Sequence, residues 1–363
     1  MSSRPQVLLV VEQLRRRVPG GIGSVIRGLL KGLMTLNGEL ETPPAVTLYA
    51  SRAPRGSDPL RELGRPVLQC ALPGPLMSRA WNRRLLDIPK GFDVVHALSL
   101  TAPLARDAPL VVTVHDVAWQ QVPETFPARG RRWHEAALRR ALRRAAVLVV
   151  TSEPVARDLV AAGAPEDVVR VIPLGSDQLP PPDFVASEEL LGRLGVDGEF
   201  LLSVSTLEPR KNLPRLLNAY ELARARLPDA WPLVVVGPRG WGPRIVPGRG
   251  IVLAGQVGEA TLTALYRRAR LLAYVPLAEG FGLPPLEAMR EGTPVVASSV
   301  PSAGEATMEV DPFDVEDIAQ ALVTVATDQK ARQQLVSAGR VHAAALTWAK
   351  TARCHVELWE SLS

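Results

Sequence analysis

One stretch, Ala278–Met289, constrains the fold of this chain more than any other. The apolar run Leu271–Val275 precedes it and is typical of a buried parallel strand. Gly280 and Gly282 then permit a tight turn, and the Pro284–Pro285 pair suits the first turn of a helix, where a missing N–H costs nothing. The sequence therefore predicts a strand, a glycine turn and a helix start, which together attract an anion such as phosphate.

Two carboxylates flank this predicted anion site. Glu279 lies in the turn, and Glu287 lies about one turn into the helix. A carboxylate beside a phosphate-attracting turn needs another partner, and sugar hydroxyl groups are good candidates. The alternative is an acidic cap at the helix N-terminus, worth under ~1 kcal/mol. A cap would not explain the two glycines on either side of a phenylalanine.

The whole string, from Glu279 through Gly-Phe-Gly-Leu-Pro to Glu287, resembles the signature of the retaining nucleotide-sugar glycosyltransferases of family 4, the glycosyl transferases of group 1. The resemblance implies the α/β GT-B fold, in which two Rossmann-like, doubly wound domains face a cleft. It also implies that Glu279 holds hydroxyls of the donor sugar and that Glu287 accepts from the ribose hydroxyls. The backbone of four residues would bind the donor: Gly280, Phe281, Gly282 and Leu283.

The rest of the chain alternates apolar runs with helical patterns, which predicts parallel, doubly wound sheets. The first-half runs are Gln6–Val11, Ala45–Ala50, Phe92–Ala97, Leu110–Val114 and Val147–Thr151. Three prolines within Gln178–Asp183 mark a linker. We expect an acceptor-binding domain at 1–177, a linker at 178–198 and a nucleotide-sugar-binding domain at 199–347. By the resemblance, a final helix at about 348–363 crosses back onto the first domain.

Two places in the first half are candidates for the site. The loop Val18–Ser24 is either a plain connection or, by the resemblance, places Gly20 and Gly21 near the acceptor and the donor phosphates. His115 ends a predicted strand and is either a capped loop histidine or, by the resemblance, a contact to the donor sugar. His96 also ends a strand, and we expect it to line the cleft.

A basic loop opens the second half. Glu208–Asn212 precedes a predicted helix, which suits an anion, although it could be a capping region with incidental charge. The resemblance puts Lys211 on the donor diphosphate. Ser205 stands where many family members carry an arginine, so we expect Arg210 to supply the second charge. Gly237 ends a further strand and, by the resemblance, would form part of the wall of the base and ribose pocket.

One loop departs from the family pattern. Val300–Glu305 is shorter than the Pro-Glu-hydrophobic-Gly loop of the family. Near Ser302–Gly304 either the loop is trimmed or residues are missing from the chain.

The net charge of +5 and the isoelectric point of about 9.5 favour anionic partners without choosing among them. We do not expect nucleic-acid binding, because much of the excess is arginine that reflects background composition. The stretch Phe126–Ala145 holds the densest basic cluster. It is either a helix attracted to an anionic membrane surface or a solvated helix face that covers a sheet.

The chain carries no sign of a membrane span or a leader. No run reaches the ~18–20 apolar residues of a membrane span, and the N-terminal residues Met1–Pro5 lead directly into a strand, so we expect no signal peptide. Cys70 and Cys354 form no metal-type spacing and suggest no disulfide framework. We therefore expect a cytoplasmic protein, either free or peripheral at the inner face of the membrane.

The resemblance to family 4 implies a retaining hexosyltransferase. GDP-mannose is the first expectation for the donor and UDP-glucose the next, and the acceptor would be a glycan or a lipid-linked glycan. No metal cofactor is expected, because the chain has no Asp-x-Asp motif. Two alternatives stay open. In a nucleotide-sugar epimerase, His115 and Asp116 would be the candidate acid and base groups of the first domain. The other is a nucleotide-sugar-binding protein without turnover, which the presence of both glutamates and Lys211 disfavours.

Overall fold

The protein is described by a computed structural model that covers residues 4–16, 18–227 and 229–363, so the expectation for Met1–Ser3 lies outside the described residues. The chain divides into two compact units. The N-terminal unit comprises Met1–Val117, Pro127–Gln178 and Thr347–Ser363, and the C-terminal unit comprises Ala118–Phe126 and Leu179–Leu346.

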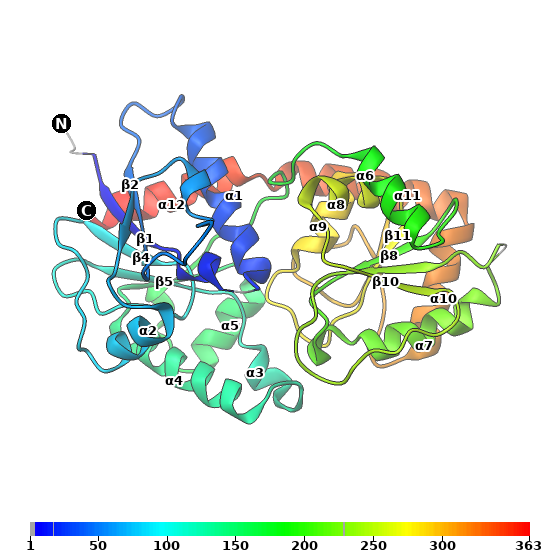
Figure 1. The fold of residues 1–363 in the computed structure, drawn as a ribbon, viewed down its shortest axis with the longest axis horizontal. Helices are drawn as coiled ribbons and strands as arrows, with labels where there is room; N and C mark the ends of the chain where they lie inside the picture. Colours follow the sequence, from blue (N-terminus) through cyan, green and yellow to red (C-terminus); the bar gives the residue numbers. More distant parts are fainter. Residues whose placement is uncertain (1–3, 17, 228) are drawn as a thin grey trace. The chain divides into compact units, whose positions relative to one another are not determined.

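A seven-stranded parallel sheet forms the centre of the N-terminal unit, in the order β3-β2-β1-β4-β5-β6-β7 (Figure 1). The strands β4, β5 and β6 are buried along their whole length, which explains their continuous Val and Leu runs. The strand order reverses between β1 and β4, and ligands of such sheets bind at the carboxyl edge near this point. The strands are β1 (Gln6–Val10), β2 (Ala45–Ala50), β3 (Val67–Gln69), β4 (Val94–Ala97), β5 (Leu110–Val114), β6 (Val147–Val150) and β7 (Val169–Val171).

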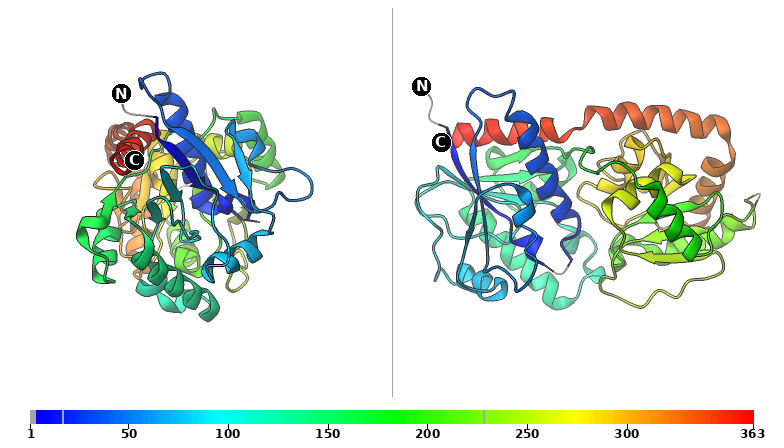
Figure 2. Two further views of the ribbon diagram at one scale, coloured as in Figure 1. Left: turned by 90° about the vertical axis from the view of Figure 1, so that its left-hand side faces the viewer. Right: turned by 45° about the horizontal axis from the view of Figure 1, so that its top comes forward.

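Helices cover this sheet, and the last helix of the chain is one of them. They are α1 (Gly20–Leu36), α2 (Gly74–Asn82), α4 (Ala128–Arg144), α5 (Glu153–Ala161) and α12 (Trp348–Leu362). Figures 1 and 2 show α12 lying along α1, and the two helices are in contact. A Cβ atom at Gly28 or Gly32 would overlap Trp348, so these glycines let the helices meet. The prediction that the final helix crosses back onto the first domain is confirmed.

A six-stranded parallel sheet forms the centre of the C-terminal unit, in the order β10-β9-β8-β11-β12-β13. This order places β8 and β11 side by side, with Leu201 opposite Leu271. The loops that follow these two strands therefore meet at one edge of the sheet. The strands are β8 (Leu201–Val204), β9 (Leu233–Val236), β10 (Ile251–Gly255), β11 (Leu271–Tyr274), β12 (Val295–Ala297) and β13 (Met308–Glu309).

Two groups of helices cover the two faces of this sheet (Figure 1). The helices α7 (Leu213–Arg224) and α10 (Val315–Thr327) pack together on one face, where the buried side chains of Tyr220, Ile318 and Leu322 belong to the main core. The other face carries α6 (Phe184–Arg193), α8 (Glu259–Arg268), α9 (Leu283–Arg290) and α11 (Gln329–Ala345).

Some features were not apparent from the sequence. The short helix α3 (Ala118–Gln121) and the residues up to Phe126 belong to the C-terminal unit, although they come from the first half of the chain. Trp241 Nε1 donates to Thr125 O over 2.9 Å, and the Trp241 ring lies 5.7 Å from the Phe126 ring. The segment 178–198 contains α6. The edge strands β3 and β13 have only three and two residues, too few to show a period.

Candidate active site

The turn before α9 has the shape that its glycines and prolines predict. The helix begins at Leu283, directly after Gly282, whose φ is 92°. A side chain at Gly282 would be strained by this φ, and its Cβ would lie 3.2 Å from Ser302 Oγ. Pro284 and Pro285 occupy the first turn of the helix. The side chains of Phe281 and Leu283 are buried, so they hold the turn against the C-terminal unit.

Glu279 lies at the centre of a polar cluster in this turn. Its Oε2 forms an ion pair with Lys211 Nζ and accepts from the Tyr274 hydroxyl over 2.6 Å. Arg210 Nη1 lies 3.4 Å from the same oxygen. The three charged side chains are only 10–15% exposed, so solvent screens their interaction weakly.

The loop Glu208–Asn212 is fastened to this turn by its backbone as well. The Leu277 N–H donates to Arg210 O over 2.8 Å, and Arg210 Nη1 donates to Ala278 O over 3.2 Å. Arg210 Nε also donates to Glu208 Oε1 over 2.6 Å. The fold thus brings the basic loop and the Glu279 turn together, as the order of β8 and β11 requires.

Asn212 ends this loop in a left-handed conformation, with φ of 59°. Its Nδ2 donates to Val275 O over 3.1 Å and to Pro312 O over 2.7 Å. Asn tolerates this backbone region better than most residues. Asn212 therefore ties the start of α7 to the end of β11.

The cluster perturbs the acidity of its members. Burial by itself would raise the pKa of Glu279, but Lys211 and Arg210 lower it to about 2. Burial, followed by repulsion from Arg210, lowers the pKa of Lys211 from its ordinary value, and Glu279 opposes this change. Burial and the Glu279 carboxylate raise the pKa of Tyr274 well above its usual range. The groups act as one set: an anionic carboxylate, two cations and a neutral tyrosine.

The second glutamate of the motif has a different environment. Glu287 lies on α9 with 6% of its surface exposed, and its Oε2 accepts from the Tyr266 hydroxyl over 2.9 Å. Burial and Glu287 raise the pKa of Tyr266 well above its ordinary value. Tyr266 comes from α8, so each glutamate of the motif is held by its own tyrosine.

The ends of β8 and β9 meet closely. Ser205 N–H donates to Val236 O over 3.0 Å, and Gly237 N–H donates to Gly255 O over 2.8 Å. Gly237 has φ of 145°, and a Cβ atom there would overlap Ser205 O. Only glycine lets the two loops approach in this way.

The candidate residues of the N-terminal unit lie at the carboxyl edge of its sheet. Gly20, with φ of 60°, and Gly21 begin α1, and a Cβ atom at either would meet open space. His115 follows β5 and is half-buried, with its Nε2 2.9 Å from Leu98 O.

The expectation that His96 lines an open site is wrong. Its side chain is fully buried, and its Nε2 lies 2.9 Å from Thr113 Oγ1. Its Nδ1 accepts from Trp359 Nε1 over 3.2 Å, and its ring stacks on His355 at 5.4 Å. His96 therefore belongs to the core beneath α12, which the sequence around it could not indicate.

Three residues of the cluster were not singled out from the sequence: Glu208, Asn212 and Tyr274. A tyrosine within the apolar run Leu271–Val275 was the one available signal, because its hydroxyl needs a partner when buried. Tyr274 finds two, since its hydroxyl donates to Glu279 and accepts from Lys211 Nζ over 2.8 Å.

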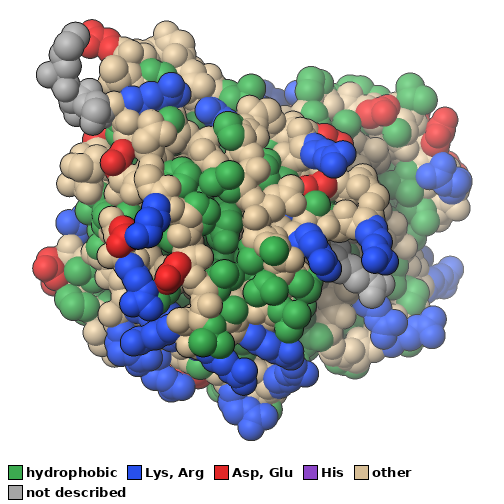
Figure 3. Space-filling model, turned by 60° about the vertical axis from the view of Figure 1, so that its left-hand side comes forward, with side chains coloured by type: hydrophobic (Ala, Val, Ile, Leu, Met, Phe, Trp, Pro, Cys, Tyr) green, Lys and Arg blue, Asp and Glu red, His purple; other side chains and the backbone are tan. Residues whose placement is uncertain are grey.

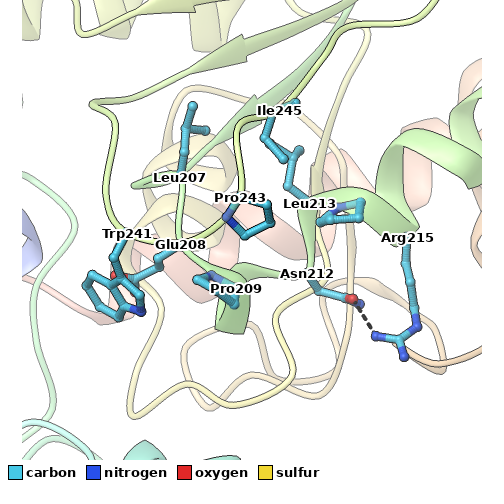
Figure 4. A pocket seen from close by; sticks show the side chains of 10 residues that line it. Leu207, Glu208, Pro209, Asn212, Leu213, Arg215, Trp241, Pro243 and Ile245 are labelled. Atoms are coloured by element: carbon cyan, nitrogen blue, oxygen red, sulfur yellow. Dashed lines mark hydrogen bonds between the residues drawn. The ribbon is translucent and has the colours of Figure 1, made fainter. Parts of the chain in front are cut away.

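An apolar pocket of about 360 Å³ lies beside the basic loop (Figure 4). Within it, Arg215 Nη1 donates to Asn212 Oδ1 over 2.9 Å. Its lining comes from the loop after β8, the start of α7 and the loop after β9, and comprises Leu207, Glu208, Pro209, Asn212, Leu213, Pro214, Arg215, Trp241, Pro243 and Ile245.

Comparison with known families matches both halves of the chain. Residues 20–175 match the glycosyl transferase 4-like domain, and residues 198–328 match the glycosyl transferases of group 1. The fold is similar to the crystal structure of Anabaena Alr3699/HepE in complex with UDP-glucose, with a TM-score of 0.72 and 19% identity over 99% of this chain and 100% of that one.

Three relatives of known type are glycosyltransferases. The O-antigen chain mannosyltransferase B of Escherichia coli is 31% identical over 263 residues, which are 66% of each chain. The serotype-specific mannosyltransferase WbdA of Escherichia coli is 33% identical over 47% of this chain, which spans only 23% of that protein. The D-inositol 3-phosphate glycosyltransferase of Geodermatophilus obscurus is 30% identical over 90% of this chain and 79% of its own length. The protein therefore belongs to family 4 of the glycosyltransferases, the glycosyl transferases of group 1, and has the GT-B fold.

Proposed function

We propose that the protein transfers a sugar from a nucleotide-diphosphate donor to a glycan or a lipid-linked acceptor, with retention of the anomeric configuration. The observation that carries this proposal is the pair of cations, Lys211 and Arg210, held against Glu279 where α9 begins. The similarity to two mannosyltransferases of Escherichia coli favours mannose, with GDP-mannose as donor. UDP-glucose, which the Anabaena protein binds, is the next candidate.

The basic loop would stabilise the leaving group. The diphosphate gains negative charge as the bond to the sugar breaks, so fixed cations stabilise the transition state more than the ground state. Lys211 and Arg210 are already oriented by the protein, which limits the reorganisation that the reaction needs. The start of α9 adds backbone N–H groups that can donate to the diphosphate. Pro284 and Pro285 have no N–H, so Gly282 and Leu283 supply these donors.

Glu279 and Glu287 would bind different parts of the donor. Glu279, whose pKa of about 2 keeps it ionised at neutral pH, would accept hydroxyls of the donor sugar and orient it. Glu287 would accept from the ribose hydroxyls. Gly237 has no side chain to cover its backbone, and it would form part of the wall around the base and the ribose.

The N-terminal unit would supply the other contacts. We assign His115 to the donor sugar, and Gly20 and Gly21 to the donor phosphates and the acceptor. The open space around Gly20 and Gly21 supports this assignment, because a ligand can approach their backbone closely.

A basic surface on this unit suits an acceptor that is carried in a membrane. Figure 3 shows many Lys and Arg side chains gathered on the lower part of one face. The helix α4 carries Arg139, Arg140, Arg143 and Arg144, and none of the four has an acidic side chain within ion-pair distance among the described residues.

A further cation, Arg84, follows α2 and lies near enough to Arg144 at the end of α4 to affect its pKa. Burial lowers the pKa of Arg144, and Arg84 and Arg143 lower it further, so these cations lie close together. We propose that this face contacts anionic lipid headgroups. Among the described residues, no helix is long and apolar enough to cross a membrane.

Binding of the donor tests the proposal directly. Thermal unfolding would be followed with GDP-mannose, UDP-glucose, ADP-glucose and a dTDP-sugar at equal concentration. A donor present at 100 times its Kd adds about 2.7 kcal/mol to the free energy of unfolding, so the correct nucleotide should stand out. The anomeric configuration of the product, read by NMR with a lipid-linked oligosaccharide as acceptor, then tests retention. Conversion of the donor sugar without an acceptor would instead indicate an epimerase, and binding without any product would indicate a binding protein.

Vesicle co-sedimentation tests the lipid contact. Binding to phosphatidylglycerol vesicles at low salt, but not to phosphatidylcholine vesicles, is expected. The variant Arg139→Glu should weaken this binding, whereas Arg193→Glu on α6, the same charge reversal in the other unit, should keep it. Equal binding by both variants would contradict the proposed surface.

A further inference from the structure

A partly buried segment between β12 and β13, residues 298–307, packs against the turn that begins α9. Val300 and Ser302 in this segment are 6% and 0% exposed. The Ser302 N–H donates to Phe281 O over 2.9 Å, and Ser302 Oγ donates to Gly282 O. One residue of this segment, Ser302, therefore holds two consecutive carbonyl groups of the turn.

These two hydrogen bonds fix the direction of two N–H groups. A trans peptide unit is planar, and its C=O and N–H point in opposite directions. No cis peptide bond occurs among the described residues. Because Ser302 holds the Phe281 carbonyl, the Gly282 N–H points away from Ser302. Because Ser302 also holds the Gly282 carbonyl, the Leu283 N–H points away from it as well.

Ser302 is held in turn by α11. His342 Nε2 lies 2.8 Å from Ser302 O. A carbonyl oxygen can only accept, so His342 Nε2 carries the proton and donates it. Gly304, with φ of 53°, leaves room for this ring, because a Cβ atom there would lie 3.2 Å from His342 Cε1. The contacts run from α11 through Ser302 to the turn.

We propose that Ser302, held by His342, is a positioning residue that aims the Gly282 and Leu283 N–H groups at the diphosphate of the donor. This inference rests on the proposed function, which places a diphosphate at the start of α9. Ser302 acts from behind the turn, through hydrogen bonds to backbone carbonyls. Its effect is to keep the two donors oriented before the ligand arrives, which lowers the cost of binding and of stabilising developing charge.

The test measures binding of inorganic pyrophosphate and of GDP by calorimetry to the full-length chain. Ser302→Ala removes one of the two hydrogen bonds, and its Kd for both ligands is expected to rise about 10-fold, the scale of one lost charge-assisted bond. In an amide NMR spectrum, pyrophosphate should shift the Leu283 signal of the original protein and shift it less in Ser302→Ala. Loss of packing alone would lower the unfolding temperature without changing either ligand readout.

A matched control separates the hydroxyl from burial. Ser187 on α6 is also fully buried, and its Oγ donates to Phe184 O over 2.8 Å. Ser187→Ala should leave the pyrophosphate Kd unchanged. The Lys211→Ala variant tests the proposed function separately. If Lys211→Ala does not weaken pyrophosphate binding, the diphosphate site itself is wrong. If it does and Ser302→Ala does not, only the positioning role is wrong.

His342 provides a second pair of variants on a half-buried helix face, where folding is less at risk. His342→Leu removes the donor and should weaken pyrophosphate binding several-fold, while His342→Gln retains an N–H donor and should bind nearly as well as the original. The double variant with Ser302→Ala should be little worse than Ser302→Ala, since both changes act through the same peptide units. The inference is wrong if His342→Leu binds pyrophosphate as tightly as the unsubstituted protein. It is also wrong if the increase in Kd of the double variant equals the product of the two single increases.

Discussion

The substitution Glu279→Gln should reveal how strongly the protein holds its two cations. Glu279 Oε2 contacts Lys211, Arg210 and Tyr274, and the side chain is 11% exposed. Its pKa falls from 4.5 to about 2 in the folded protein. A change of about 2.5 units corresponds to about 3 kcal/mol in favour of the folded state at neutral pH.

This variant should lower the unfolding temperature and raise the affinity for a free nucleotide. A loss of about 3 kcal/mol lowers the midpoint by roughly 6–12 °C in a domain of this size. The diphosphate must take Lys211 and Arg210 from Glu279, so removal of the carboxylate should tighten GDP binding, by about 10-fold if half of the ion-pair energy is recovered. Turnover should nevertheless fall steeply, because the proposed contact to the donor sugar is lost.

The assay combines calorimetric unfolding, titration with GDP and steady-state kinetics. Glu291→Gln is the matched control, because Glu291 ends the same helix and pairs with the more exposed Arg267. The control should lose less than ~1 kcal/mol. An unfolding temperature and a GDP affinity in Glu279→Gln equal to those of the unsubstituted protein would contradict this expectation. A decrease in GDP affinity with turnover intact would show that Glu279, and not Glu287, binds the ribose.

Three further predictions follow from the same structure. Lys211→Ala and Arg210→Ala should each reduce kcat/KM by roughly 10²–10³-fold, whereas Ser205→Ala should change the activation free energy by less than ~0.5 kcal/mol. If Arg210→Ala keeps the kinetics of the unsubstituted protein, Lys211 is the single cation of the site. Transfer should survive excess chelator, since we propose that Lys211 and Arg210 hold the diphosphate, and a loss that Mg²⁺ reverses would disprove this mechanism. Burial lowers the pKa of His355 to about 4 and that of His96 well below 6.5, so the unfolded chain binds more protons as the pH falls from about 6.5. The free energy of unfolding should therefore decrease between pH 6.5 and pH 4, by about 3 kcal/mol from His355 alone, and equal urea midpoints at pH 7.5 and pH 4.5 would contradict it.

The sequence determined the local shapes of this protein. Apolar runs, glycines and prolines act within a few residues, through φ preferences and the period of burial. The strand, turn and helix start at 271–289 could therefore be predicted, with Gly282 at the position where positive φ is required. The same reasoning predicted the parallel sheets and the basic loop before α7.

The tertiary structure decided which of these pieces meet. Lys211 and Glu279 are 68 residues apart, and they pair because β8 lies beside β11, an order that depends on the packing of the whole unit. Tyr274 and Asn212 gain their partners in the same way. The expectation that His96 lines the cleft was wrong because it too depends on distant residues. The Trp359 and His355 side chains that bury it come from α12, the last helix, and no pattern near His96 contains that information. Local sequence restricts the backbone, but only the complete fold brings distant side chains within the few ångströms at which hydrogen bonds and ion pairs act.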